Sequence, residues 1–205
     1  MVTQILAGKT HKEMDFDRLL YAQELVMLIA HLDAFLGDSL RTICRKEPKM
    51  LYSNKQMRWD SILKQGNWQN LTESMIEEHT YQFGWKSIRE RLAFLSSEYG
   101  LSITTPSAEL LVIDEAEKTR HIVIHNGGKV SQEYIARSGK TDVQIGELIP
   151  ISSDDTDRIS MIAQMLGADV FLAIAQKFFK AEKKELTGIL RRPITAGKSS
   201  KSKKR

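Results

Sequence analysis

Cysteine is almost absent from this sequence. Cys44 is the only one in 205 residues, so no disulfide can form within the chain. A disulfide framework is therefore excluded, and the composition fits a reducing compartment. Residues 1–15 also lack the basic stretch, long apolar run and small-residue cleavage site of a secretion signal. We therefore expect a cytoplasmic protein.

Proline and glycine are also scarce, and long apolar runs are missing. Four prolines and 12 glycines leave long uninterrupted stretches for helices, and no segment repeats at a fixed period. The apolar window LLYAQELVMLIAHLDAFL is interrupted by Glu24, His31 and Asp33, and VFLAIAQKFF is too short to cross a bilayer. Hydrophobic and charged fractions of 41% and 27% are those of a globular protein. We expect no membrane contact.

The positive charge is concentrated at one end of the chain. Residues 188–205 hold seven lysines and arginines and no acid, and subtracting them from the net charge of +4 leaves residues 1–187 at −3. The Gly/Ser/Lys-rich end has too little apolar content to fold alone. We therefore divide the chain into a helical domain, 1–187, and a disordered basic tail, 188–205, which either holds a polyanion loosely or serves only solubility.

Apolar residues recur at helical spacing along most of the domain. In 16–44, leucines and isoleucines follow each other at intervals of three and four, which predicts a long amphipathic helix. Thr72 is a candidate cap for a later helix, and Thr105 or Ser107 for another. The sequence predicts an all-α bundle of five or six helices, with a largely loop-like stretch at 131–153. The further predicted helices span 55–65, 72–83, 85–100, 104–125 and 154–184.

One short stretch, RHIVIHNGG at 120–128, carries the strongest functional signal. Arg120 and His125 lie five residues apart, which on a helix is about 7.5 Å of rise and roughly 140° of rotation. A long arginine side chain can curl toward a histidine one turn further on. An imidazole takes or gives a proton near neutral pH, and a guanidinium has the shape and charge to hold phosphate oxygens. The pair therefore suits phosphodiester chemistry.

Other site types find little support in the sequence. It has no phosphate-cradling glycine loop, no Gly-x-Ser-x-Gly elbow and no zinc-finger spacing, so we expect no metal and no cofactor. Trp59, Trp68 and Trp85 cluster in mid-chain with Tyr81 and Phe83. We expect them to anchor the core rather than to form a platform on which bases stack.

The stretch around Arg120 resembles the motif of the HEPN domain family, an Arg-x4-6-His pattern late in a small all-helical domain. Here Arg120 is followed by polar His121, three apolar residues, His125, Asn126 and Gly127. The layout of about residues 15–180 is also similar, with a long first helix, the motif on a late helix and a closing helix. The position after the arginine is most often Asn or Asp in the family, so His121 is a departure.

The resemblance implies a function and partners. Many HEPN domains are metal-independent endoribonucleases of bacterial toxin or phage-defence systems, and they form homodimers in which both motifs face one cleft. By this resemblance His125 would exchange a proton as the RNA 2′-OH attacks the adjacent phosphate, Arg120 would stabilise the charge on that phosphate, and His121 and Asn126 would support substrate binding. RNA, a second copy of the chain and an antitoxin or activating protein are the implied partners. Other HEPN domains have lost catalysis and only bind, which leaves a binding module as the alternative.

Simpler interpretations of the same residues stay open. His125 could be a hydrogen-bonded structural histidine, and Arg120 could pair with Glu115 or Glu117 on the surface. Asn126-Gly127 is also a strong hairpin signal, which would make HIVIH and GKVSQ two strands. His121 and His125, four residues apart, could bind zinc, although no further ligands are evident.

Overall fold

A computed structural model describes residues 16–51, 58–139, 143–182 and 186. Within these ranges the chain is all-α, as predicted, and an antiparallel bridge between Lys129 and Leu148 is the only β-type pairing. The predicted tail, 188–205, and the first residues of the predicted helix 55–65 lie outside the described ranges. The elements are α2 (Phe16–Lys46), η1 (Pro48–Leu51), α3 (Trp59–Lys64), α4 (Trp68–Gly84), α5 (Ile88–Tyr99), α6 (Ser107–Asn126), α7 (Gln132–Ser138) and α8 (Ser153–Phe179).

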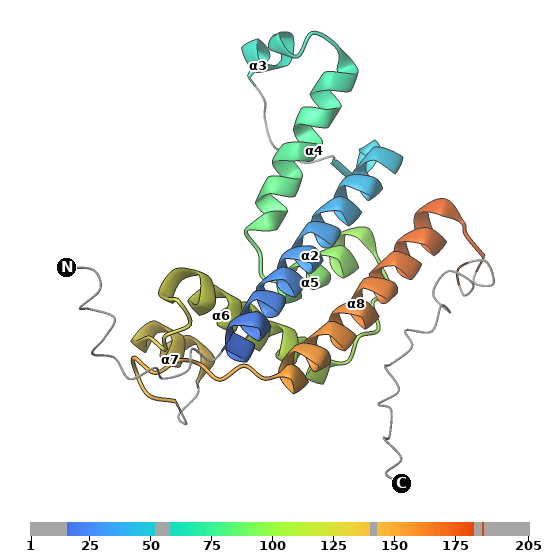
Figure 1. Cartoon of the computed structure of the whole chain (residues 1–205). Coiled ribbons are helices and arrows are strands. Elements are labelled where there is room, and N and C mark those ends of the chain that lie inside the picture. Colours follow the sequence, from blue (N-terminus) through green and yellow to red (C-terminus); the bar gives the residue numbers. More distant parts are fainter. Residues whose placement is uncertain (1–15, 52–57, 140–142, 183–185, 187–205) are drawn as a thin grey trace.

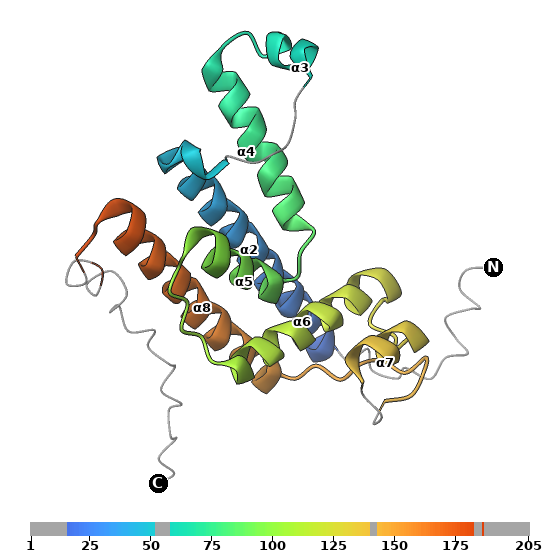
Figure 2. The ribbon, with the colours of Figure 1, turned by 180° about the vertical axis from the view of Figure 1, so that it is seen from behind.

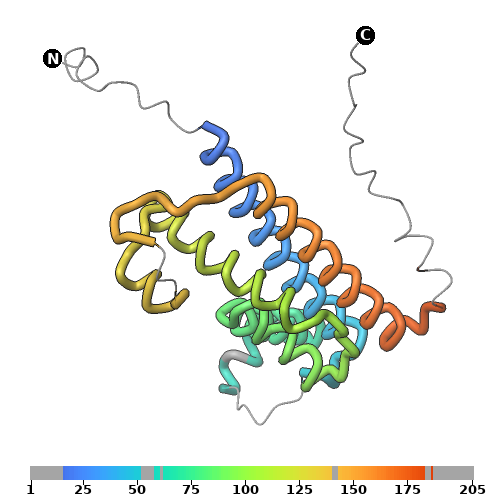
Figure 3. Tube along the Cα trace, turned by 90° about the horizontal axis from the view of Figure 1, so that it is seen from below, coloured from blue at the N-terminus to red at the C-terminus, as the bar shows by residue number. Residues whose placement is uncertain are grey.

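The bundle is built on α2 and α8, which lie side by side and run in the same direction (Figures 1 and 3). Helix α6 packs across α2 and α8 near the N-terminal ends of these two helices. Helix α5 packs against α2 and α6 on the face that Figure 2 shows. The buried face of α2 repeats at three- and four-residue spacing, as predicted for an amphipathic helix. Its buried apolar residues are Ala22, Leu25, Ile29, Leu32, Leu36, Leu40, Ile43 and Cys44.

Local capping chemistry determines where several helices begin. Ser87 at the start of α5 and Ser152 at the start of α8 each form a reciprocal capping box with an acid three residues on. Thr72 does not cap α4, because that helix begins earlier, with the Asn67 side chain accepting from the Asn70 N–H. Neither Thr105 nor Ser107 caps α6; Pro106 occupies the cap position and no side chain bonds there.

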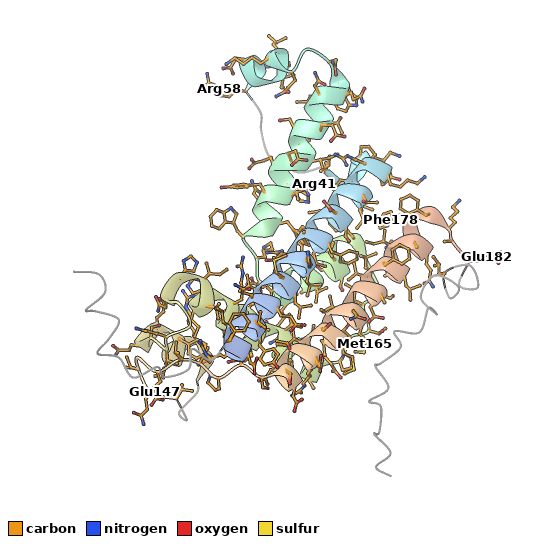
Figure 4. All side chains as sticks on the ribbon, viewed as in Figure 1. Arg41, Arg58, Glu147, Met165, Phe178 and Glu182 are labelled. Atoms are coloured by element: carbon orange, nitrogen blue, oxygen red, sulfur yellow. The ribbon has the colours of Figure 1, made fainter. Side chains whose placement is uncertain are left out.

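Helix α3 and the first turns of α4 form an arm that projects from the bundle (Figures 1 and 2). Arg58, just before α3, lies at the far end of this arm (Figure 4). The prediction that the mid-chain tryptophans anchor the core was wrong. Trp59, Trp68 and Trp85 are 80%, 73% and 76% exposed as whole residues, and only Phe83 of the predicted aromatic cluster is buried.

A buried arginine fastens the α4–α5 junction to α2. The Arg91 side chain is 8% exposed. Its Nη1 donates to Asp33 Oδ1 of α2 at 2.9 Å, and its Nε and Nη2 donate to backbone carbonyls of Lys86 and Gly84 at 2.7 and 2.8 Å. The guanidinium also lies over the Phe83 ring, 5.6 Å from its centre. Each nitrogen of the fork therefore has an acceptor, so this buried charge is compensated.

A second polar cluster lies among the packed helices. The Tyr99 hydroxyl of α5 hydrogen-bonds His79 Nε2 of α4 at 2.7 Å and lies 3.6 Å from Cys44 Sγ of α2. Burial raises the pKa of the Cys44 thiol and, more strongly, that of the Tyr99 phenol. Both groups therefore stay neutral, and the cluster ties three helices together.

Helices α2 and α8 are each long and apolar enough to cross a bilayer, judged by length and composition alone. From the sequence we predict that the apolar window of α2 is too interrupted by polar residues to cross a bilayer, and that of α8 too short. The two helices also supply about half of the buried residues of the bundle core, and core helices of this length pass the same test. The test is therefore weak support for a membrane location.

Candidate functional site

The motif lies on the last turns of α6, whose end is set by two glycines. Gly127 adopts φ +60° as the left-handed cap, and its N–H and that of Gly128 both bond the Ile122 carbonyl. Asn126 is the last helical residue, so the hairpin alternative was wrong. The glycine stop leaves His125 in the final helical turn, where its side chain is exposed.

The segment that follows α6 folds back and places α7 beside the motif. Residues 128–130 pair with 146–149 through three backbone hydrogen bonds of 2.8–2.9 Å, and the stretch predicted as largely loop, 131–153, contains the short helix α7. Arg18 of α2 fastens this pairing by donating from Nε to the Ile149 carbonyl at 3.1 Å. Glu147, at the edge of the loop, is labelled in Figure 4. The loop therefore holds α7 in a fixed position against the end of α6.

A small pocket of about 100 Å³ lies between α6 and α7. His121 and His125 stand on adjacent turns of α6 and face the pocket, with their ring centres 4.5 Å apart. Its charged lining residues are Lys118 of α6 and Glu133 and Arg137 of α7. The remaining lining residues are Ile122, Asn126, Ser131 and Tyr134. Three of the four predicted site residues, His121, His125 and Asn126, therefore share one pocket.

Arg120, the fourth predicted residue, does not line this pocket. Its Nε atom is buried and, among the described residues, has no hydrogen-bond acceptor. The predicted surface pairing with Glu115 or Glu117 is not found in the described part of the chain. Glu115 accepts from the Tyr134 hydroxyl at 2.7 Å, and Glu117 accepts from the Ile88 N–H at the start of α5. Among the described residues, Arg120 is thus not part of the pocket that His125 lines.

Glu117, one turn before Arg120, is the most perturbed acid of the region. Burial raises the pKa of its carboxyl to about 7, and the nearby carboxylates of Asp33 and Asp114 act in the same direction. The bond from the Ile88 N–H and the charge of Arg91 partly oppose this shift. Glu117 therefore changes charge close to neutral pH, although it lies outside the pocket.

The described residues hold no group of three or more His, Cys, Asp or Glu placed to bind a metal ion. His121 and His125 share a face, as their spacing predicted, but within those residues no third ligand of these types joins them. This arrangement does not support the zinc alternative.

Two cations of the pocket were not singled out in the sequence. Lys118 lies three residues before His121 and seven before His125, which is the spacing of one helical face and could have been noticed. Arg137 comes from another helix, and no spacing in the sequence connects it to α6.

A larger, apolar groove lies elsewhere, between the second halves of α2 and α8. It measures about 400 Å³ and is lined mainly by Phe35, Phe171, Ile174, Ala175 and Phe179. It holds one charged residue, Asp38, so it lacks the mixed charges of the α6–α7 pocket. The α6–α7 pocket is therefore the better candidate for acid–base chemistry.

Comparison of the chain with protein-family models, curated proteins and solved structures found no match. The HEPN resemblance accordingly rests on the residues of the motif and the helical layout alone.

Proposed function

We propose that the protein is a metal-independent endoribonuclease of HEPN type. His125 takes the proton from an RNA 2′-OH, whose oxygen forms a bond to the adjacent phosphorus. The bond from phosphorus to the 5′-oxygen breaks, and His121 donates a proton to that leaving oxygen. The products are a 2′,3′-cyclic phosphate and a 5′-OH. Asn126 supports the bound RNA from the end of α6.

One observation carries this proposal: two imidazoles lie 4.5 Å apart, exposed at a pocket that also contains two cations. Phosphodiester cleavage by 2′-OH attack needs one group that accepts a proton and another that donates one. Imidazoles suit both tasks near neutral pH, and neighbouring cations stabilise the charge that builds on the phosphate.

Arg120 keeps a role in the proposal, although it lies outside the pocket of its own chain. Its buried Nε has no acceptor among the described residues, so the described part of the chain does not explain this arginine. In a homodimer with the ends of α6 at the interface, residues of both copies would contact one RNA phosphate. The Arg120 guanidinium would stabilise the negative charge on that phosphate. An antitoxin or activating protein, in a cytoplasmic toxin or phage-defence system, belongs to the same proposal.

A second candidate function is a non-catalytic module that binds RNA or a nucleotide in the same pocket. The separation of Arg120 from His125 favours it, because a phosphate in the pocket would lack the motif arginine of that chain. Binding requires the cations but no proton transfer.

RNA cleavage in the presence of EDTA separates the two functions. We expect the wild-type protein to leave 2′,3′-cyclic phosphate ends and His125→Ala to cleave about 100-fold more slowly, the usual size of a lost acid–base group. His31→Ala is the matched control, because His31 is also exposed but lies on α2, outside the pocket.

The outcomes are distinct. Cleavage that is lost in His125→Ala and retained in His31→Ala supports the enzyme. Equal cleavage by all three proteins would assign the activity to a contaminant and reject the ribonuclease. RNA binding without cleavage by the wild-type protein would support the binding module.

A further inference from the structure

We infer that Lys118 and Arg137 form the phosphate-binding site of the α6–α7 pocket, which Arg120 of the same chain does not line. The two cations come from different helices and line the same pocket as His121 and His125. The anion they would hold is a phosphate or phosphodiester group. That this anion is the scissile phosphate rests on the proposed ribonuclease function.

Lys118 is available to a ligand. It shares the helical face of His121 and His125 and makes no ion pair within the described residues. An ammonium group on a flexible stem can follow a phosphate as charge develops on its oxygens. Lys118 would therefore supply one positive charge to the α6 side of the pocket.

Arg137 supplies the second charge from the opposite wall. Its Nη2 is 2.8 Å from Glu133 Oε1, one turn earlier on α7, and both side chains are largely exposed. Exposed pairs of this kind contribute little stability. The planar fork has five N–H donors, so a guanidinium held by Glu133 through one nitrogen keeps donors for an anion.

The size of the pocket limits what it can take. A volume of about 100 Å³ has room for a single phosphate group and is too small to enclose a whole nucleotide, since pockets for drug-sized ligands measure about 300–1,000 Å³. The sugar and base of a bound RNA would then lie outside, over the exposed His121 and His125 rings. The pocket would grip the backbone rather than read the base.

Glu133 places a negative charge inside the proposed phosphate site. Its carboxylate faces the same pocket and competes with a phosphate for Arg137. Glu133→Gln would remove this competitor and its negative charge while keeping the side-chain shape. Phosphate should then bind more tightly than to the wild-type protein, whereas loss of either cation should weaken binding.

The test is a titration of the full chain with inorganic phosphate, followed by the NMR signals of the His121 and His125 rings. We expect phosphate to shift both rings, with binding about tenfold weaker in Lys118→Gln and in Arg137→Gln, as for loss of one charged hydrogen bond. Binding should tighten about threefold in Glu133→Gln, because removing one competing charge-assisted contact has a smaller effect. Arg158→Gln, at an exposed cation of α8 that does not line the pocket, should bind like the wild type.

Phosphate affinities that do not change in Lys118→Gln and Arg137→Gln would overturn the inference, as would equal weakening in Arg158→Gln. Loss of binding in Arg120→Gln alone would return the anion site to the motif arginine. A folded state is checked for each variant by its circular dichroism. No RNA cleavage enters these measurements, so rejection of the ribonuclease by the His125→Ala experiment and rejection of the phosphate site are separate results.

Discussion

Arg91 at the α4–α5 junction and Arg120 near the end of α6 both have buried nitrogen atoms. They differ in whether these nitrogens have hydrogen-bond acceptors. Arg91 has three acceptors and an aromatic ring around its guanidinium. Arg120 has a buried Nε with no acceptor among the described residues. The burial of Arg91 is explained by the fold, because its charge is compensated by acceptors within the chain. The described part of the chain does not explain the second arginine in the same way.

The strongest test of this contrast is Arg91→Met. The substitution keeps an apolar stem but leaves the Asp33 carboxylate and two backbone carbonyls without their donor, so we expect unfolding free energy to fall by about 3 kcal/mol. Urea unfolding followed by circular dichroism measures it. The control is Arg89→Met on the same helix, where the side chain is 56% exposed and 3.6 Å from Asp114, and where the loss should stay below about 1 kcal/mol. Equal losses would remove the special status of Arg91.

Glu117 lies between the two regions and tests their electrostatics by pH. Its folded pKa of about 7 lies above the ordinary value of 4.5, so the folded chain holds this proton more tightly than the unfolded chain. The associated stability is fully present below pH 4.5 and is lost as pH rises through 7. Glu117→Gln should therefore be more stable than the wild type by about 1 kcal/mol at pH 8, a figure reduced for the carboxyl's remaining solvent contact.

Unfolding curves of both proteins between pH 4.5 and 8 check this expectation. The Gln side chain can still accept from the Ile88 N–H, so the difference between the curves isolates the charge. A wild-type advantage that grows with pH would show that Arg91 or another cation compensates the carboxylate.

The smallest stability effect belongs to Arg120→Met. Because Nε has no acceptor to lose in the described part of the chain, we expect a change within about 1 kcal/mol, in the direction of greater stability. Urea unfolding of the variant beside Arg91→Met gives the comparison directly. A destabilisation as large as that of Arg91→Met would mean that Arg120 is a structural arginine after all.

The sequence predicted the positions of the helices better than the exposure of their side chains and the contacts between them. Leucine and isoleucine spacing located α2, and the helices predicted at 85–100 and 104–125 end within one residue of α5 and α6, where Gly100 and Gly127 form left-handed caps. The starts were less certain, since Asn67 and Thr72 are both good caps and only the structure shows which N–H groups are free.

Exposure and the composition of the pocket could not be predicted in the same way. The sequence around Trp59 and Trp68 indicates helices, but not that these residues stay uncovered by the other described elements. Likewise, His121 and His125 were predicted as neighbours, whereas Arg137 reaches them only because residues 128–130 and 146–149 pair and fix α7. Contacts between distant segments depend on tertiary packing, which periodicity does not contain.

The exposed arm also decides what tryptophan fluorescence can report. All three indoles of the chain are largely in water in the native state, so unfolding removes none of them from an apolar interior. Their emission should shift little across the unfolding transition. A shift to shorter wavelength on adding another molecule would instead indicate that an exposed indole has been covered, either Trp59 or Trp68 on the arm or Trp85 at the end of α4.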